Sequence, residues 1–146
     1  MTTNLLDAVA TYLSSNSSTD VGFGVHQLTI GVNLFKARLP AEATDEVVLV
    51  QMYEGAAPVF SMGAEPIAID NPKLQLLVRG NREDYPGTND LAMTVRHILS
   101  TVVGNTTMSG LLVLRIQPLG MPNYIGVDDT DRPKFTINFQ VAMAGS

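Results

Sequence analysis

The sequence predicts an α+β fold, with a mixed, largely antiparallel sheet of about five strands and two helices packed on one face. Three observations lead to this prediction. Residues 135–143 alternate strictly between apolar and polar side chains, which is typical of a strand with one buried face. Two other segments carry apolar residues at helical spacing. Several further short apolar segments are separated by turn-forming residues, as expected when helices cover one face of an antiparallel sheet.

The first expected element is a helix that begins near Leu5. Asn4 can cap it, and Asp7 lies in the first turn, where a negative charge is favourable. A run of serines and an asparagine at residues 14–18 ends this helix. Residues 14–33 are rich in Ser, Gly and Asn and are expected to form a long loop that becomes ordered only against partners. The apolar stripe of the helix consists of Leu5, Leu6, Val9 and Leu13.

Strands are predicted next at residues 34–39 and 46–53, with a turn at residues 40–42 between them. The second strand contains four consecutive apolar residues, 47–50, which is typical of a strand covered on both faces near the centre of a sheet. Residues 55–72 carry three prolines and two glycines, so this stretch is predicted to be irregular or at a sheet edge. An alternating strand follows at residues 74–78.

A second helix is predicted to start at Thr88 or Asn89, either of which can cap it, and to end at Gly104. A strand at residues 111–116 and the closing strand at 135–143 complete the order αβββαββ, with residues 123–133 as a loop. Residues 1–146 are expected to form a single domain. The apolar face of the second helix consists of Leu91, Val95, Ile98, Leu99 and Val102.

Composition narrows the class of protein. Only 16% of the residues are charged, against an average near 25%, which fits either a surface covered by neighbouring subunits or a merely neutral surface. The net charge of −5 argues against a protein that binds nucleic acid by neutralising phosphates. The absence of cysteine excludes a disulfide scaffold, a thiolate metal site and a cysteine nucleophile. No secretory signal and no apolar run of about 18 residues is visible, so an intracellular protein without a membrane span is expected.

No catalytic, cofactor or metal motif is complete. Gly22-Phe23-Gly24 lacks the preceding strand and the remaining residues of a phosphate-binding loop. His97 is interpreted as a polar surface residue, His26 lies in the loop of residues 14–33 and is assigned no role, and no serine stands in a hydrolase motif. The carboxylates Asp128, Asp129 and Asp131 are weakly similar to a Ca²⁺ loop, but Pro133 occupies the position that requires glycine and the distal glutamate is missing. Two interpretations of this cluster stay open: aspartates that support a turn, or acidic contacts to a basic partner surface.

Taken in order, several segments resemble the small tail terminator proteins of long-tailed bacteriophages, which are also called minor capsid or tail-completion proteins. No single segment is specific, and the resemblance lies in their order and spacing over almost the full length. The chain departs from the family in residues 14–33 and in Tyr85-Pro86-Gly87-Thr88, an apparent insertion before the second helix. The matching segments are residues 5–9, 35–40, 47–54 and 76–80, the second helix and residues 124–135.

The resemblance implies a structural virion protein without cofactor or catalytic activity. It implies a hexameric ring at the head–tail junction that caps the tail tube, ends tail elongation and offers a surface for head joining. The implied partners are other copies of the chain, the tail tube protein and a head-completion or connector protein, with DNA passing through the lumen without specific binding. The residues predicted at subunit or tail contacts are Lys36, Arg38, Tyr124, Asp128, Asp129, Asp131, Arg132 and Lys134.

Two alternatives remain at this point. The chain could be another connector component, either a head-completion stopper or a tail tube protein, and a tube protein would polymerise into long tubes instead of stopping at one ring. A protein of a different class, a small metabolite-binding domain or enzyme, would be a monomer with a pocket that holds His97 or the Asp128–Asp131 cluster.

Overall fold

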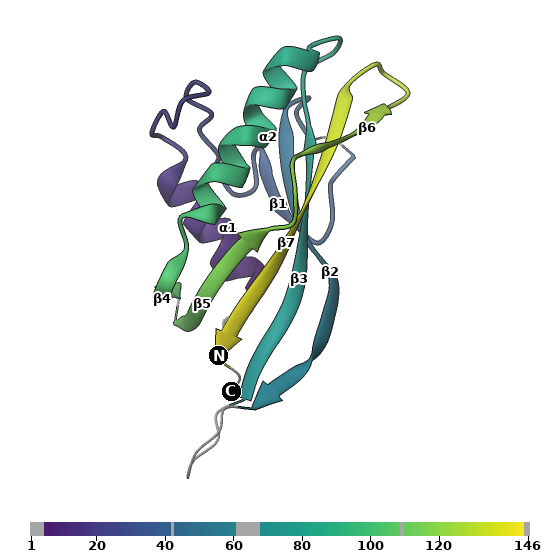
Figure 1. The fold of residues 1–146 in the computed structure, drawn as a ribbon. Helices are drawn as coiled ribbons and strands as arrows, with labels where there is room; N and C mark the ends of the chain where they lie inside the picture. Colours follow the sequence, from purple (N-terminus) through teal and green to yellow (C-terminus); the bar gives the residue numbers. More distant parts are fainter. Residues whose placement is uncertain (1–4, 42, 61–67, 109, 145–146) are drawn as a thin grey trace.

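The computed structural model describes residues 5–41, 43–60, 68–108 and 110–144, and its two helices lie on one face of a single sheet (Figure 1). The predicted α+β class is therefore confirmed. No helix among the described residues is long and apolar enough to cross a membrane. The elements are α1 (Leu5–Asn16), β1 (Leu34–Lys36), β2 (Val47–Phe60), β3 (Ala68–Arg79), α2 (Tyr85–Ser100), β4 (Val103–Met108), β5 (Leu111–Pro118), β6 (Asn123–Val127) and β7 (Pro133–Ala144).

The sheet has seven strands among the described residues, where about five were expected. Their order is β1-β2-β3-β7-β5-β4, and β6 also pairs with β7. β1 runs parallel to β2, and every other pairing is antiparallel. β4 and β6 are the two strands that the sequence did not predict. β6 was missed because nearly all of its side chains are exposed, so its sequence lacks the alternation of a half-buried strand.

At the end of the sheet that contains β6, five strands lie side by side in the order β1-β2-β3-β7-β6, and we call them the five-strand row. β1 and β6 are the outer strands of this row, each paired with another strand on one side only. Residues in register across a sheet point to the same face. The line on the helix side is Leu34, Val48, Val78, Phe135 and Tyr124, and the line on the opposite face is Phe35, Leu49, Leu77, Thr136 and Asn123.

The core lies between the helices and this sheet. Along β7 the predicted alternation is confirmed, because Phe135, Ile137, Phe139 and Val141 are buried and the residues between them are half-buried. Burial of each such side chain contributes about 1.5–3 kcal/mol to folding. The helices contribute buried side chains that were predicted for their apolar faces: Val9 and Leu13 from α1, and Leu91, Val95, Ile98 and Leu99 from α2.

The face of the sheet away from the helices carries a ladder of amide side chains. Gln51 Nε2 donates to Gln75 Oε1 over 2.9 Å, and Gln75 Nε2 donates to Asn138 Oδ1 over 3.1 Å. The ladder links β2, β3 and β7 and satisfies three half-buried amides. Val47 and Leu49 are also buried on this face, which confirms that residues 47–50 are covered on both sides.

The start of α2 differs from the prediction. Asp84 is the N-cap, and its carboxylate accepts a hydrogen bond from Gly87 N over 3.0 Å. Tyr85-Pro86-Gly87-Thr88 therefore forms the first turn, because proline is tolerated there without loss of a helical hydrogen bond. The helix ends at Ser100 and not at Gly104, and Val102 is buried beyond it.

Residues 55–72 also differ from the prediction of an irregular stretch or edge. β2 continues to Phe60 and β3 begins at Ala68, and the two strands pair with register shifts after Met52 and Ala56. These irregularities accommodate residues that disfavour a regular ladder. Residues 61–67 of that stretch lie outside the described residues.

The end of the first strand was also predicted incorrectly. β1 ends at Lys36 because Ala37 has a φ of 63°, which no extended strand contains. Within residues 14–33, Leu28 is buried, its N–H donates to Ser17 Oγ and its carbonyl accepts from Ser14 Oγ. The expectation that this loop becomes ordered against partners stays a prediction.

Candidate assembly surfaces

The turn between β6 and β7 is built around the carboxylate of Asp128. Its Oδ1 accepts hydrogen bonds from the backbone N–H groups of Thr130 and Arg132, each over 3.0 Å. Its Oδ2 accepts from Arg132 Nε over 2.8 Å, and Arg132 Nη1 donates to Asp45 Oδ1 over 3.1 Å. We call these three side chains, Asp45, Asp128 and Arg132, the clasp. The interpretation of Asp128 as a support for a turn is confirmed.

The fold shifts the pKa values of Asp128 and Arg132 in the clasp. Burial opposes ionisation of Asp128, but the hydrogen bonds from the N–H groups of Arg132 and Thr130 outweigh it and hold the pKa of Asp128 well below its usual range. Burial lowers the pKa of Arg132, but the hydrogen bonds to Asp128 and Asp45 outweigh it and raise this pKa overall. Both ionised forms are therefore stabilised by the fold.

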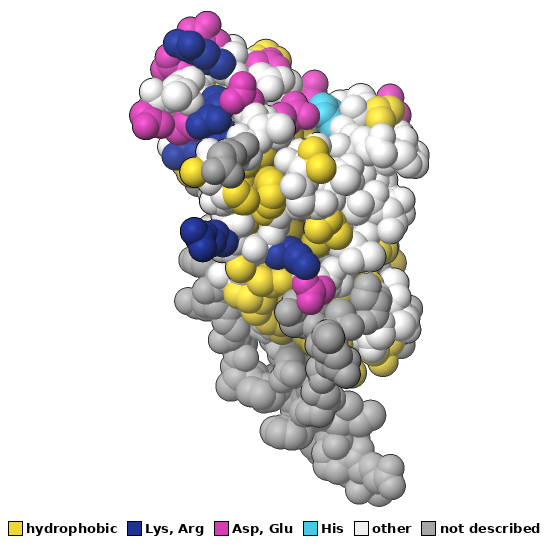
Figure 2. Space-filling model, turned by 180° about the vertical axis from the view of Figure 1, so that it is seen from behind, with side chains coloured by type: hydrophobic (Ala, Val, Ile, Leu, Met, Phe, Trp, Pro, Cys, Tyr) yellow, Lys and Arg dark blue, Asp and Glu magenta, His cyan; other side chains and the backbone are white. Residues whose placement is uncertain are grey.

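Backbone hydrogen bonds tie the same turn to the start of α2. Gly80 N donates to the carbonyl of Pro133 over 3.0 Å, and Glu83 N donates to that of Asp131 over 2.9 Å. Arg79, a buried cation, donates to the carbonyls of Thr44 and Asp45 over 2.6 and 3.0 Å. Figure 2 shows charged side chains of both signs gathered at this end of the molecule. The turn is consequently held in place from two sides.

Next to this turn, β6 presents exposed apolar side chains. The rings of Tyr85 and Tyr124 lie 5.0 Å apart, centroid to centroid, and both contact the buried ring of Phe135 at 5.3 and 5.4 Å. The turn before β6 is held by Arg96 Nε, which donates to the carbonyl of Gly120 over 2.8 Å. We call the exposed residues here the β6 surface: Tyr85, Met121, Tyr124, Ile125 and Val127.

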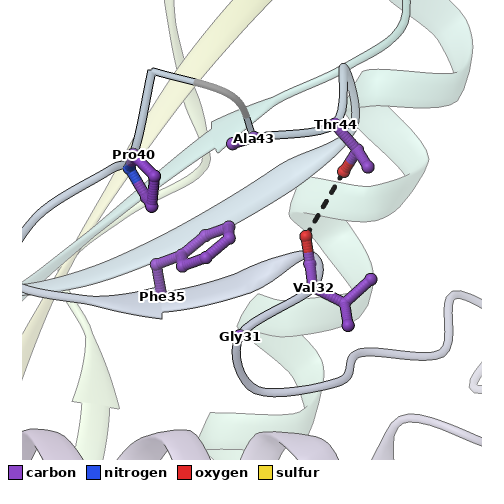
Figure 3. Close-up of a pocket in the computed structure, with 6 residues that line it drawn as sticks. All are labelled: Gly31, Val32, Phe35, Pro40, Ala43 and Thr44. Atoms are coloured by element: carbon purple, nitrogen blue, oxygen red, sulfur yellow. Dashed lines mark hydrogen bonds between the residues drawn. The ribbon is translucent and has the colours of Figure 1, made fainter.

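At the other outer strand of the five-strand row the surface is concave. A hollow of about 420 Å³ opens beside β1, and the close-up in Figure 3 shows the ring of Phe35 and the side chain of Pro40 facing it. Its rim is closed on one side by a weak hydrogen bond of 3.5 Å from Thr44 Oγ1 to the carbonyl of Val32. We call it the β1 hollow, lined by Gly31, Val32, Phe35, Pro40, Ala43 and Thr44.

The predicted contact residues fall into two groups at opposite edges of this row. Lys36 and Arg38 belong to the β1 edge, where Lys36 pairs with Asp7 and Arg38 is exposed. The other six residues lie on β6, on the turn after it or at the start of β7: Tyr124, Asp128, Asp129, Asp131, Arg132 and Lys134. The charged groups of Asp128 and Arg132 bind each other within the molecule, whereas Asp129 is exposed and Asp131 forms an ion pair of 3.7 Å with Arg82.

Sequence reasoning missed several residues that shape these surfaces. Tyr85 was placed in an insertion, and only its ring contacts with Tyr124 and Phe135 show its role. Phe35 carried no signal beyond strand propensity, although it lines the β1 hollow. Asp45 and Arg79 are distant in sequence from the turn that they support. Among the described residues, no three His, Asp or Glu side chains are grouped as a metal ion would require.

The described part of the sheet therefore has two unlike edges, one with the exposed β6 surface and one with the β1 hollow. The chain belongs to the bacteriophage tail terminator protein family, whose sequence profile matches residues 12–144. The predicted resemblance is therefore confirmed, and the protein is a structural component of a phage tail or head–tail region.

The fold recurs in a virion. A chain from the virion of a native gene transfer agent particle superposes with a TM-score of 0.61 at 14% sequence identity. The similarity covers 97% of this chain and 95% of that one, so the whole fold is shared. No curated protein sequence matches the chain.

Proposed function

We propose that this chain forms a hexameric ring at the head–tail junction, which caps the tail tube, ends tail elongation and offers the surface for head joining. The observation that carries the proposal is the family match over residues 12–144, which includes all or part of every helix and strand. Residues 1–146 act as one structural unit in this proposal, and the role is mechanical and not catalytic.

The proposed partners are other copies of the chain, the tail tube protein and a head-completion or connector protein, with DNA passing through the lumen without specific binding. Lys36, Arg38, Tyr124, Asp129, Asp131 and Lys134 are proposed to lie at subunit or tail contacts. Asp128 and Arg132 support the same contacts by holding the β6–β7 turn, because Arg132 already donates hydrogen bonds to both Asp128 and Asp45.

The rigidity of this turn supports the proposal. Backbone hydrogen bonds from Gly80 and Glu83 fix the turn on the side that faces the start of α2. The clasp fixes the turn on the side that faces Asp45. A contact surface that is ordered before binding loses less conformational entropy on association, so a preorganised turn favours assembly. The exposed tyrosines beside it are of the residue type enriched at interface hot spots.

The test is electron microscopy of lysates from the parent phage with an early stop codon in this gene. We expect overlong tails without heads beside filled heads, and tails of normal length when the wild-type chain is supplied in trans. Tails of normal length beside leaking heads would move the role to head completion. Intact infectious particles would refute the proposed function.

A further inference from the structure

The two edges of the five-strand row differ in shape. On β6 several apolar side chains are exposed, and Val127 is 49% exposed. Beside β1 the surface is hollowed, and Val32 at the hollow is 54% exposed. Exposed apolar side chains can fill a concave apolar surface, whereas two hollows placed against each other would leave their space unfilled. The difference favours a head-to-tail contact over a two-fold contact between like edges.

The charges at the two edges are also complementary. Asp129 and Asp131 lie on the turn that follows β6, and Asp129 has no ion pair within the part of the chain that the structure describes. Arg38 lies between β1 and Pro40 of the hollow, and its guanidinium likewise makes no ion pair with a described residue. Opposite charges beside complementary apolar surfaces favour one pairing and set its register.

Each edge leaves apolar area in water when the chain is alone. Burying it contributes roughly 25 cal/mol per Å² of apolar surface removed from water. The hollow presents apolar side chains from Val32, Phe35, Pro40 and Ala43 and no charged lining residue, which suits apolar side chains of a protein better than a charged small molecule. A second copy of this chain carries such side chains next to an acidic turn.

We propose that the β6 surface of one copy seats in the β1 hollow of the next, with Tyr124, Ile125 and Val127 facing the hollow and Asp129 facing Arg38. This inference rests on the proposed self-association into a ring. It adds the identity of the two edges that meet and the head-to-tail arrangement of the contact. Because the edges lie at opposite ends of the same row, each copy uses one edge for each neighbour, as the head-to-tail contacts of a ring require.

The chain contains no cysteine, so single cysteines report the contact without competing thiols. The test uses Val127→Cys and Val32→Cys in separate chains, which are supplied together to the stop-codon phage. Tails are then purified and treated with a short bismaleimide. The matched control is Val103→Cys on β4, a valine that is 60% exposed and away from both edges.

A covalent dimer is expected from the mixture of the 127 and 32 variants, and none from either variant alone or from the 103 variant mixed with the 32 variant. Dimers from the 127 variant alone, or no dimer from the mixture in tails of normal length, would overturn the proposed contact and leave the proposed function intact.

The two proposals fail separately. If the stop-codon phage without added chain already makes normal tails joined to heads, the proposed function fails. The same mixture is then cross-linked as purified protein, where a 32–127 dimer would support the contact and its absence would overturn it.

Discussion

Replacing Asp128 by asparagine tests how much the clasp contributes to folding. Asparagine keeps the oxygen that accepts from Thr130 N and Arg132 N, so the turn geometry is retained, but the charge opposite Arg132 is lost. The two side chains are only 15% and 19% exposed, so solvent screens the pair weakly. A hydrogen bond to a charged group contributes roughly 1.5–3 kcal/mol. We therefore expect Asp128→Asn to lower the free energy of unfolding at pH 7 by about 2 kcal/mol.

This loss depends on pH in a defined direction. The fold depresses the pKa of Asp128, so its contribution is fully present above the unfolded-state value of about 3.9 and is lost as pH falls toward the folded-state value. At pH 3 the unfolded chain is mostly protonated at this residue while the folded chain is still ionised. Linkage then predicts that the difference between the wild type and Asp128→Asn shrinks by roughly 1 kcal/mol between pH 7 and pH 3.

The assay is urea unfolding followed by circular dichroism, at pH 7 and pH 3, for both proteins. A parallel thermal scan at pH 7 should show a melting temperature lowered by about 4–8 °C. The control is Asp129→Asn, the neighbouring exposed carboxylate, which should change stability by less than about 0.5 kcal/mol. Equal stability of Asp128→Asn and the wild type at pH 7, or a difference that stays constant down to pH 3, would refute this account of the clasp.

The remaining predictions concern the backbone. A Cβ added at Gly80 would lie 1.6 Å from the hydroxyl oxygen of Thr88 and 2.7 Å from the Cβ of Thr88. Gly80→Ala should therefore lower the free energy of unfolding by about 1–3 kcal/mol. An unchanged denaturant midpoint would contradict this close packing. Ala37 has a φ of 63°, so Ala37→Gly should raise the free energy of unfolding by roughly 0.5–1 kcal/mol. The control Ala41→Gly changes a residue without positive φ and should lower the free energy of unfolding. Denaturant midpoints that move the same way in both variants would count against strain at Ala37.

The sequence by itself determined the buried faces of β7 and of the two helices. The alternation along residues 135–143 fixed which face of β7 is buried, because one register alone places Phe135, Ile137 and Phe139 inside. Helical spacing likewise identified the buried faces of α1 and α2. These signals are local, because the buried face of a helix or strand requires apolar residues at the spacing of that same element.

The family resemblance was also available from the sequence, although no single segment carried it. The profile of the tail terminator family matches residues 12–144, and the fold is similar to that of a virion chain. Order and spacing of segments persist where individual residues do not, because the length of each strand and loop is set by the sheet that it belongs to.

Only the tertiary structure decided what lies at the edges of the sheet. β6 has too few apolar residues on one face to be predicted as a strand, and it forms because β7 supplies the hydrogen-bonding ladder. The clasp joins Asp45 to Arg132, and the β1 hollow combines a strand with two loops. Such contacts join residues far apart in the chain, so no local period records them. The surfaces proposed for assembly are built from these long-range contacts, whereas the buried faces that support them follow the periodicity of the sequence.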